Sequence, residues 1–393
     1  MEGRPALPTG TSYATGFKPT LEGLRAVAAF GIMATHVAFQ TGIDPATAPG
    51  AVLARCDFFV AVFFALSAFV LWRRYRGGMN TWEYYLKRLA RILPAYVCLC
   101  AVVLLCTGAP AGKALATLTL TQIYLPNSLL PGLTHAWSLS VEMAFYLVLP
   151  LFVALLGRWR PRWRVLGILV LAGVGLAWAW VPLPDLSRAG VNTQLFPPSW
   201  LPWFAVGMLA AEAEAALRGP VLSRRWRWLW WLGAGAVAWV AGQEWFGPLG
   251  LEHPSPAEFT RRVLAGTLFA VLILVPYALG EPSRALESPL MRALGRWSYG
   301  IFLWHVAVLM VVFPVLGVPY FRARWTDFLL VGVVCAVVSV VLAATSYVVV
   351  ESPVVARLRE MPLRSSTGSR LTCVEPSGER QVKRPSSVRS STP

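Results

Sequence analysis

The chain alternates between long apolar stretches and short polar connections. Ten stretches of about 17 to 23 residues hold few charges, and each is long enough to cross a bilayer as a helix. They occupy residues 21–40, 53–72, 92–108, 139–157, 165–182, 200–217, 228–246, 263–280, 297–316 and 328–350. The pattern predicts an all-α, polytopic membrane protein with about ten transmembrane helices.

One connection is longer than the others. Residues 109–138 contain LATLTLTQIYLP, which is too short to span a bilayer, and then a stretch with Pro and Gly. Irregular backbone at membrane depth must be shielded by protein or water. We therefore expect a re-entrant or interfacial segment on the outer face, because a crossing here would invert every later helix.

Composition agrees with a single membrane domain. Of the 393 residues, 56% are hydrophobic and only 14% are charged, which is far from an ordinary soluble domain. We expect a cytoplasmic N-terminal segment at 1–17, a membrane-embedded domain at 18–356, and a disordered basic cytoplasmic tail at 357–393, where Ser, Pro and Arg dominate. No cleavable signal sequence is evident.

The predicted membrane topology accounts for the net charge of +16. If the N-terminus is cytoplasmic, 27 of the 35 Lys and Arg residues lie on the cytoplasmic side and seven on the other, with Arg25 inside its span. This distribution obeys the positive-inside rule. It predicts a multi-pass protein of the cytoplasmic (inner) membrane with both termini in the cytoplasm, whose partner is the lipid bilayer and not nucleic acid.

Several chemistries have no sequence signal. The six cysteines lack zinc spacing, and the four histidines form no H-x3-H or H-E-x-x-H pair, so no metal site is predicted. The chain also contains no P-loop and no GxGxxG motif. ATP hydrolysis and dinucleotide redox chemistry are therefore not expected.

The first apolar stretch carries two ionisable residues, Arg25 and His36. Such residues at membrane depth cost about 2.5 to 3.5 kcal/mol and are functional-site candidates by default. Eleven residues make about three helical turns plus 20°, so both side chains project from one face, about 16 Å apart. They can line one path across the membrane.

Five further segments carry polar groups within apolar surroundings: FFALSAF (63–69), RLARILP (88–94), HAWSLSVEMAFY (135–146), LGRWSYGIFLWH (294–305) and SYVVVESP (346–353). They follow, in this order, an arginine and a histidine that are separated by ten residues. With these motifs the chain resembles the acyltransferase 3 family of integral membrane acyltransferases. The resemblance covers about residues 17–355. It implies transfer of an acyl group, usually acetyl, from acyl-CoA to a hydroxyl of a carbohydrate or other acceptor. Acyl-CoA is then a co-substrate, and no bound cofactor is expected.

The resemblance and the chemistry together assign roles to the first helix. A neutral imidazole can take the proton from an attacking hydroxyl, so His36 is the candidate general base. The alternative is a core histidine bonded to a backbone carbonyl. Arg25 matches the basic residue of the family's R-x10-H motif, which is implicated in handling the acyl donor.

Arg88 and Arg91 match the family's RxxR motif. CoA carries several phosphate charges, and guanidinium groups bind phosphate bidentately, so both arginines are candidate donor-binding residues. The alternative is that they only anchor the chain to anionic lipid headgroups.

Other candidates surround the expected acceptor. Glu142 has two possible roles. As a catalytic residue it would fix the tautomer of His36 and stabilise its imidazolium; otherwise it would hold the acceptor. Asp57 is a weaker candidate, for which solvated helix capping is as plausible. The remaining acceptor or pocket candidates are Ser67, Trp137, Ser138 and His305.

Ser67 lies in FFALSAF, where family members commonly read FFxxSGF. Alanine at 68 therefore stands where a glycine is usual. We expect direct transfer, with Ser67 as a packing or lining hydroxyl, rather than an acyl-enzyme on Ser67.

Two other classes of function remain open. Intramembrane Arg, His and Glu also mark secondary transporters, although no hydropathy repeat supports one. A membrane scaffold would leave the ordered motifs unexplained. For an acyltransferase, a surface polysaccharide is the expected acceptor, and a macrolide or other secondary metabolite is the alternative. The sequence does not determine acyl length, regiochemistry or oligomeric state.

Overall fold

A computed structural model describes residues 16–360 except 218 and 251, and it contains helices but no β-strand within that part of the chain. The long helices are α1 (Pro19–Thr41), α3 (Phe59–Tyr75), α4 (Thr81–Thr107), α6 (Trp137–Leu156), α7 (Pro161–Trp178), α9 (Leu201–Ala216), α10 (Arg227–Ala241), α11 (Pro256–Ala278), α12 (Pro289–Leu316) and α13 (Trp325–Ser346). Short helices are α2 (Ala48–Ala54), α5 (Ala111–Leu118), α8 (Pro184–Arg188) and α14 (Ser352–Glu360). The predicted all-α class is confirmed. Most of the predicted terminal segments, 1–15 and 361–393, lie outside the described residues.

Seven helical segments of the described chain are long and apolar enough to cross a membrane. They are Ala48–Tyr75, Thr81–Thr107, Thr134–Leu156, Pro161–Trp178, Pro256–Ala278, Pro289–Leu316 and Trp325–Leu358. The other three predicted spans coincide with α1, α9 and α10. Helices α9 and α10 have only 16 and 15 residues, whereas α1 is long enough but contains Arg25 and His36. A count of ten spans therefore stays a prediction.

Local sequence signals explain where many helices begin and end. Ser255 and Glu258 form a capping box at the start of α11, and the Ser288 side chain caps α12 before Pro289. Gly42 and Gly317 end α1 and α12 in the left-handed conformation, which only glycine adopts without strain.

Small residues let the central helices approach closely. A Cβ atom at Gly207 of α9 would overlap the carbonyl oxygen of Ala65 in α3, and one at Gly295 of α12 would overlap the carbonyl oxygen of Glu22 in α1. Gly300 of α12 faces Ala343 of α13 in the same way. Such contacts are the usual means of packing helices in lipid, where a hydrophobic driving force between helices is weak.

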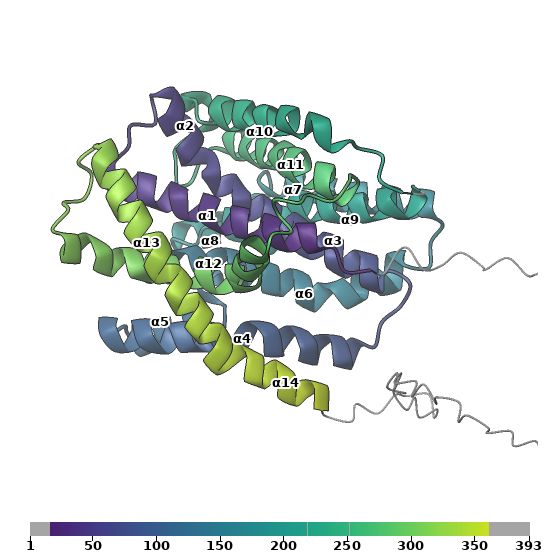
Figure 1. Ribbon diagram of the computed structural model, residues 1–393, viewed down its shortest axis with the longest axis horizontal. Coiled ribbons are helices and arrows are strands. Elements are labelled where there is room, and N and C mark those ends of the chain that lie inside the picture. The colour runs from purple at the N-terminus through teal and green to yellow at the C-terminus, as the bar shows by residue number, and fades with distance from the viewer. Residues whose placement is uncertain (1–15, 218, 251, 361–393) are drawn as a thin grey trace, which may run out of the picture.

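Helix α4 lies to one side of this centre, and α13 and α14 run diagonally across the bundle towards it (Figure 1). Tyrosine hydroxyls connect α4 to its neighbours. Tyr84 donates to the carbonyl oxygen of Tyr146 at 3.0 Å, and Tyr299 of α12 donates to that of Ile92 at 3.0 Å. The space between α4 and the centre of the bundle is where the candidate site lies.

Residues 109–138 contain only short helices. Tyr84 and Tyr85 at the start of α4 donate to the carbonyl oxygens of Tyr146 and Leu147, in the middle of α6. Tyr96 donates to the carbonyl oxygen of Thr117 at 2.6 Å and fixes α5 against α4.

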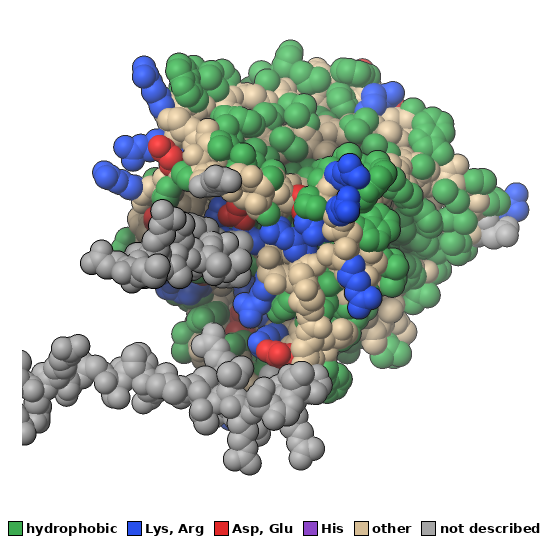
Figure 2. Space-filling model, turned by 90° about the vertical axis from the view of Figure 1, so that its right-hand side faces the viewer, with side chains coloured by type: hydrophobic (Ala, Val, Ile, Leu, Met, Phe, Trp, Pro, Cys, Tyr) green, Lys and Arg blue, Asp and Glu red, His purple; other side chains and the backbone are tan. Residues whose placement is uncertain are grey.

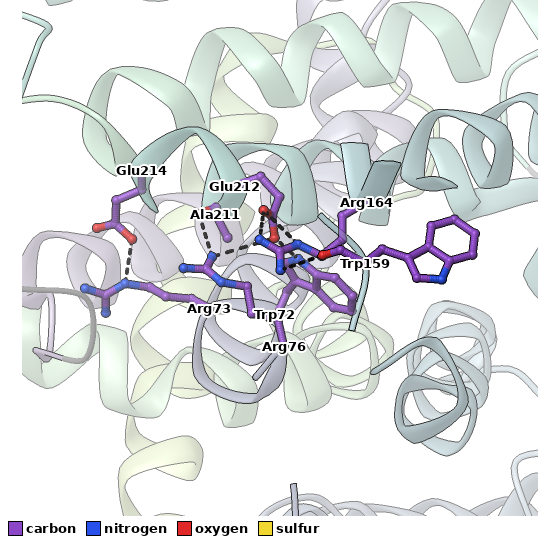
Figure 3. A network of polar contacts seen from close by, with 8 residues as sticks. All are labelled: Trp72, Arg73, Arg76, Trp159, Arg164, Ala211, Glu212 and Glu214. Carbon is purple, nitrogen blue, oxygen red and sulfur yellow. Dashed lines mark hydrogen bonds and ion pairs between the residues drawn. The ribbon is translucent and has the colours of Figure 1, made fainter. Parts of the chain in front are cut away.

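A polar network joins α3, α7 and α9 at the end of the molecule that holds the α3–α4 connection (Figure 3). Glu212 is buried and accepts hydrogen bonds from Trp72 Nε1 at 2.7 Å and Arg164 Nη2 at 2.8 Å. Arg76 lies 3.8 Å from the same carboxylate. Burial lowers the pKa of Arg76, and the charge of Glu212 opposes that shift. The network fixes three helix ends around one carboxylate.

Candidate active site

A cavity lies between α1, α3, α4, α6 and α12. Its walls carry both charged and aromatic side chains, although most of the surrounding helix surface is apolar. The lining residues are Arg25, Ile32, Val60, Phe63, Phe64, Ser67, Arg88, Arg91, Ile92, Ser138, Glu142, Tyr146, Ser298, Tyr299 and Phe302. Five of the six motif-bearing segments of the sequence thus converge on one space.

Three arginines line this cavity: Arg25 from α1, and Arg88 and Arg91 from α4. None of them forms an ion pair or donates a hydrogen bond to another side chain or carbonyl within the described residues. Arg88 packs over the Tyr146 ring, and its Nε is buried without a partner. Because one carboxylate, Glu142, faces three guanidinium groups, the cavity has an excess of positive charge that suits an anion.

Lys and Arg side chains also gather on the end of the molecule nearest to the start of α4. Figure 2 views that end and shows them around a hollow between apolar surfaces. Arg91 is exposed as well as cavity-lining. The positive charge of the cavity therefore continues to the surface.

Glu142 belongs to a second polar group within the cavity. Ser67 Oγ donates to Glu142 Oε1 at 2.5 Å, and the Tyr146 hydroxyl also donates to that oxygen. The carboxylate is thus bonded to α3 and to its own helix. It is not bonded to His36, so the first of its two expected roles finds no support in these contacts.

Three histidines meet beyond Ile32 and Phe302, at the opposite end of the cavity from the arginines. The ring centroids of His36 and His305 are 5.0 Å apart, as are those of His135 and His305. His36 Nδ1 lies 3.0 Å from His305 Nε2 and 3.0 Å from the carbonyl oxygen of Ile32. His135 and His305 are buried, whereas His36 is partly exposed.

The backbone determines which nitrogens carry protons. A carbonyl oxygen only accepts, so the Phe302 oxygen, 2.6 Å from His305 Nδ1, requires a proton on that nitrogen. Ile32 requires one on His36 Nδ1 in the same way. A neutral His305 then accepts at Nε2 from His36 Nδ1–H. His36 Nε2 keeps its lone pair and has no partner among the described residues.

The arrangement has two levels. Arg25 and His36 are eleven residues apart on α1, about 16 Å along the helix axis. Arg25 lines the same cavity as Ser67 and Glu142, whereas His36 is not among its lining residues. Arg25 and His36 are thus separated along one helix, as the sequence analysis expected, and the roles assigned to them stay predictions.

Several predicted residues lie elsewhere than expected. Trp137 packs against Trp200, with ring centroids 4.8 Å apart, and does not line the cavity. Asp57 is half-buried, lies 3.8 Å from the buried Arg55 and does not line the cavity. His305 is fully buried behind His36 and is not part of the cavity wall.

The sequence analysis did not assign His135, Tyr146 or Tyr299. His135 opens HAWSLSVEMAFY and Tyr146 closes it, while Tyr299 lies in the segment that ends in His305. The signal was therefore present in the motifs. The sequence does not show that Tyr299 donates to the Ile92 carbonyl beside the cavity, because this contact joins two helices.

No group of three or more His, Cys, Asp or Glu side chains in the described part of the chain is arranged to hold a metal ion. In the histidine cluster, one nitrogen of each ring faces a backbone carbonyl, and His36 and His305 bond each other.

Comparison with known proteins decides the family. A family model described as an acyltransferase domain matches residues 18–344. The chain belongs to the acyltransferase 3 family. It is therefore a multi-pass membrane enzyme that transfers acyl groups, and the family resemblance inferred from the motifs is confirmed.

Named relatives in this family come from several bacteria. The chain is 27% identical over 348 residues to nodulation protein 10 of Rhizobium leguminosarum bv. viciae, covering 79% of this chain and 84% of that protein. It is 27% identical over 360 residues to acyltransferase MdmB of Streptomyces mycarofaciens, covering 85% and 91%. It is 25% identical over 348 residues to the peptidoglycan O-acetyltransferase OatA of Listeria monocytogenes, covering 78% of this chain and 52% of that protein. No solved structure matches the chain.

Proposed function

We propose that this acyltransferase moves an acetyl group from cytoplasmic acetyl-CoA to a hydroxyl of a carbohydrate acceptor, with His36 as general base. The observation that carries this proposal is the free lone pair on His36 Nε2 beyond a cavity lined by three unpaired arginines.

Arg25, Arg88 and Arg91 are proposed to bind the phosphates of the donor. A guanidinium–phosphate hydrogen bond is charge-assisted, and these arginines lack competing carboxylate partners within 4 Å in the described chain. The thioester of CoA lies at the end of a long flexible arm. Binding the phosphates at the arginine level would extend that arm through the cavity towards His36.

At the other level, His36 Nε2 takes the proton of the acceptor hydroxyl as its oxygen attacks the thioester carbonyl. The carbon–sulfur bond then breaks, and the thiolate leaves with the proton that His36 returns. Transfer is direct in this scheme. Ser67 carries no acyl group in this scheme, because its hydroxyl is bonded to Glu142 and Tyr146 and has no hydrogen bond to His36 in the described structure.

A carbohydrate acceptor rests on one relative, which is named a peptidoglycan O-acetyltransferase. The proposed topology has ten spans with both termini in the cytoplasm of an inner-membrane protein. The clustering of Lys and Arg at one end of the bundle (Figure 2) supports this topology, because positive residues concentrate on the cytoplasmic side of membrane proteins. The transporter alternative has no support from the family match.

The first test is acyl-CoA turnover by purified protein in lipid nanodiscs, with native envelope glycans as acceptor. Free thiol release and product mass are measured together. We expect His36→Ala to lower kcat by about 10²- to 10⁴-fold, which is the usual contribution of a general base. His253→Ala is the matched control, because His253 is exposed and lies outside the cluster.

The donor site is tested in the same assay. Arg88→Gln should raise KM for acetyl-CoA by about 10- to 100-fold, since a hydrogen bond to a charged group contributes about 1.5 to 3 kcal/mol. Lys87→Gln is its neighbour and control, because Lys87 pairs with Glu83 on its own helix. Turnover that persists in His36→Ala would exclude His36 as the base, and equal KM values in both Gln variants would exclude Arg88 from the donor site.

A further inference from the structure

His305 is the one side chain that the described structure bonds to His36. Its Nε2 lies 3.0 Å from His36 Nδ1, and its own Nδ1 lies 2.6 Å from the Phe302 carbonyl oxygen. His305 is fully buried, so water does not compete for either bond. Its carbonyl oxygen lies 3.6 Å from Cys335 Sγ, which ties this turn of α12 to α13.

Only one arrangement of protons satisfies both rings while they are neutral. If His36 carried its proton on Nε2, its Nδ1 lone pair would face the Ile32 carbonyl oxygen at 3.0 Å. If His305 carried its proton on Nε2, its Nδ1 lone pair would face the Phe302 oxygen at 2.6 Å. Both contacts would be repulsive, so each ring is protonated at Nδ1.

We propose that His305 is a positioning residue for the acyl transfer: by accepting from His36 Nδ1–H, it orients the His36 ring and presents the Nε2 lone pair to the acceptor hydroxyl. This proposal rests on the proposed function of His36 as the base. It adds a neutral imidazole in the place that a carboxylate occupies in a Ser-His-Asp triad.

The bond also serves the protonated state. When the hydroxyl proton moves to His36 Nε2, the ring becomes an imidazolium, and its Nδ1–H becomes a charged donor. His305 Nε2 is already in place to accept from it, so the bond strengthens without any rearrangement. The Ile32 carbonyl is a second acceptor for the same proton, but it belongs to the helix ladder and is already shared.

His135 provides a comparison within the same cluster. Its ring centroid is 5.0 Å from that of His305, and it is buried like His305. Its Nε2 bonds the Leu303 carbonyl oxygen at 3.0 Å, and it forms no hydrogen bond to His36 in the described structure. Removing His135 therefore disturbs the packing of the cluster but not the bond to the base.

The experiment compares two variants at position 305. Glutamine places its amide near the position of Nε2 and can accept from His36, whereas asparagine places its amide near Nδ1 and can bond only the Phe302 carbonyl. We expect His305→Gln to keep kcat within about tenfold of the wild type. His305→Asn should lose a further 10- to 100-fold, roughly the worth of one hydrogen bond to a charged group. KM for acetyl-CoA should stay unchanged in both, because the arginines are untouched.

Thermal unfolding of each variant and the turnover of His135→Asn are the controls. The positioning role is wrong if His305→Asn and His305→Gln have the same kcat, or if both keep the wild-type kcat. It is also wrong if His135→Asn loses as much activity as His305→Asn.

A measurement that needs no activity separates this proposal from the proposed function. The chain has four histidines, so ¹⁵N-histidine labelling with single substitutions assigns each ring. We expect His36 and His305 to be protonated at Nδ1 and His135 at Nε2. A wild-type His36 protonated at Nε2 would overturn the proposal even if turnover is normal. Absent turnover with the expected protonation would instead count against the proposed reaction.

Discussion

At the scale of single residues, the cavity separates two kinds of chemistry. Arg25, Arg88 and Arg91 offer charge without local partners, whereas Ser67 and Glu142 already bond each other. A serine hydroxyl bonded to a carboxylate resembles an activated nucleophile. In the direct transfer proposed above, this serine carries no acyl group, and its hydrogen bond holds Glu142 in place.

Ser67→Ala tests this interpretation. We expect kcat to fall by no more than about tenfold, because the variant removes one hydrogen bond of the carboxylate and no reacting atom. Intact-protein mass spectrometry with acetyl-CoA and no acceptor should show no acetyl adduct on the wild type. Ser298→Ala is the control, since Ser298 also lines the cavity but bonds its own helix at Gly295. An adduct that Ser67→Ala abolishes, together with all turnover, would establish an acyl-enzyme.

At the scale of helices, close approach holds the cavity walls in register. Helix α3 carries Ser67 and packs against α9 at Gly207, where a side chain would overlap the Ala65 carbonyl oxygen and the Phe69 nitrogen. The Glu212 network joins the same two helices one turn further along (Figure 3). The position of α3 in the cavity wall thus depends on a residue that touches no substrate.

Gly207→Ala should lower the free energy of unfolding by about 1 to 3 kcal/mol, because the added methyl group forces α3 and α9 apart. Gly173→Ala in α7 is the matched control, since nothing lies within 4 Å of a Cβ atom there, and helix propensity favours alanine. Thermal unfolding in detergent, followed by tryptophan fluorescence, measures both. Equal stability of the two variants would show that the α3–α9 contact tolerates expansion.

At the scale of the whole molecule, the cavity is built from segments that are distant in sequence. Its arginines lie towards the end of the bundle where the described chain begins and ends (Figure 1), and His36 lies towards the other. A donor from the cytoplasm would then meet an acceptor near the outer surface.

This topology can be measured with single cysteines in a background free of the native ones. Gly77→Cys lies in the exposed α3–α4 connection, and Ala46→Cys lies in an exposed loop after α1. We expect a membrane-impermeant maleimide to label position 46 from outside and position 77 only after the membrane is opened. The reverse result would place the arginines outside and contradict a cytoplasmic CoA donor.

Much of this protein could be predicted from the sequence alone, because the bilayer imposes strong local rules. Apolar stretches of sufficient length must be helices, and Arg25 and His36 must share one helix face, since both follow from backbone geometry and hydrogen bonding. The arginines, Ser67, Ser138 and Glu142 do line one cavity, as their motifs indicated.

Tertiary structure decided the contacts between helices. The bond from His36 to His305, rather than to Glu142, joins residues 269 positions apart. The rotation of α6 points Glu142 towards Ser67 and leaves Trp137 against Trp200, outside the cavity. Helix rotation and partner choice depend on how side chains from several helices pack together, so no single segment of the sequence encodes them.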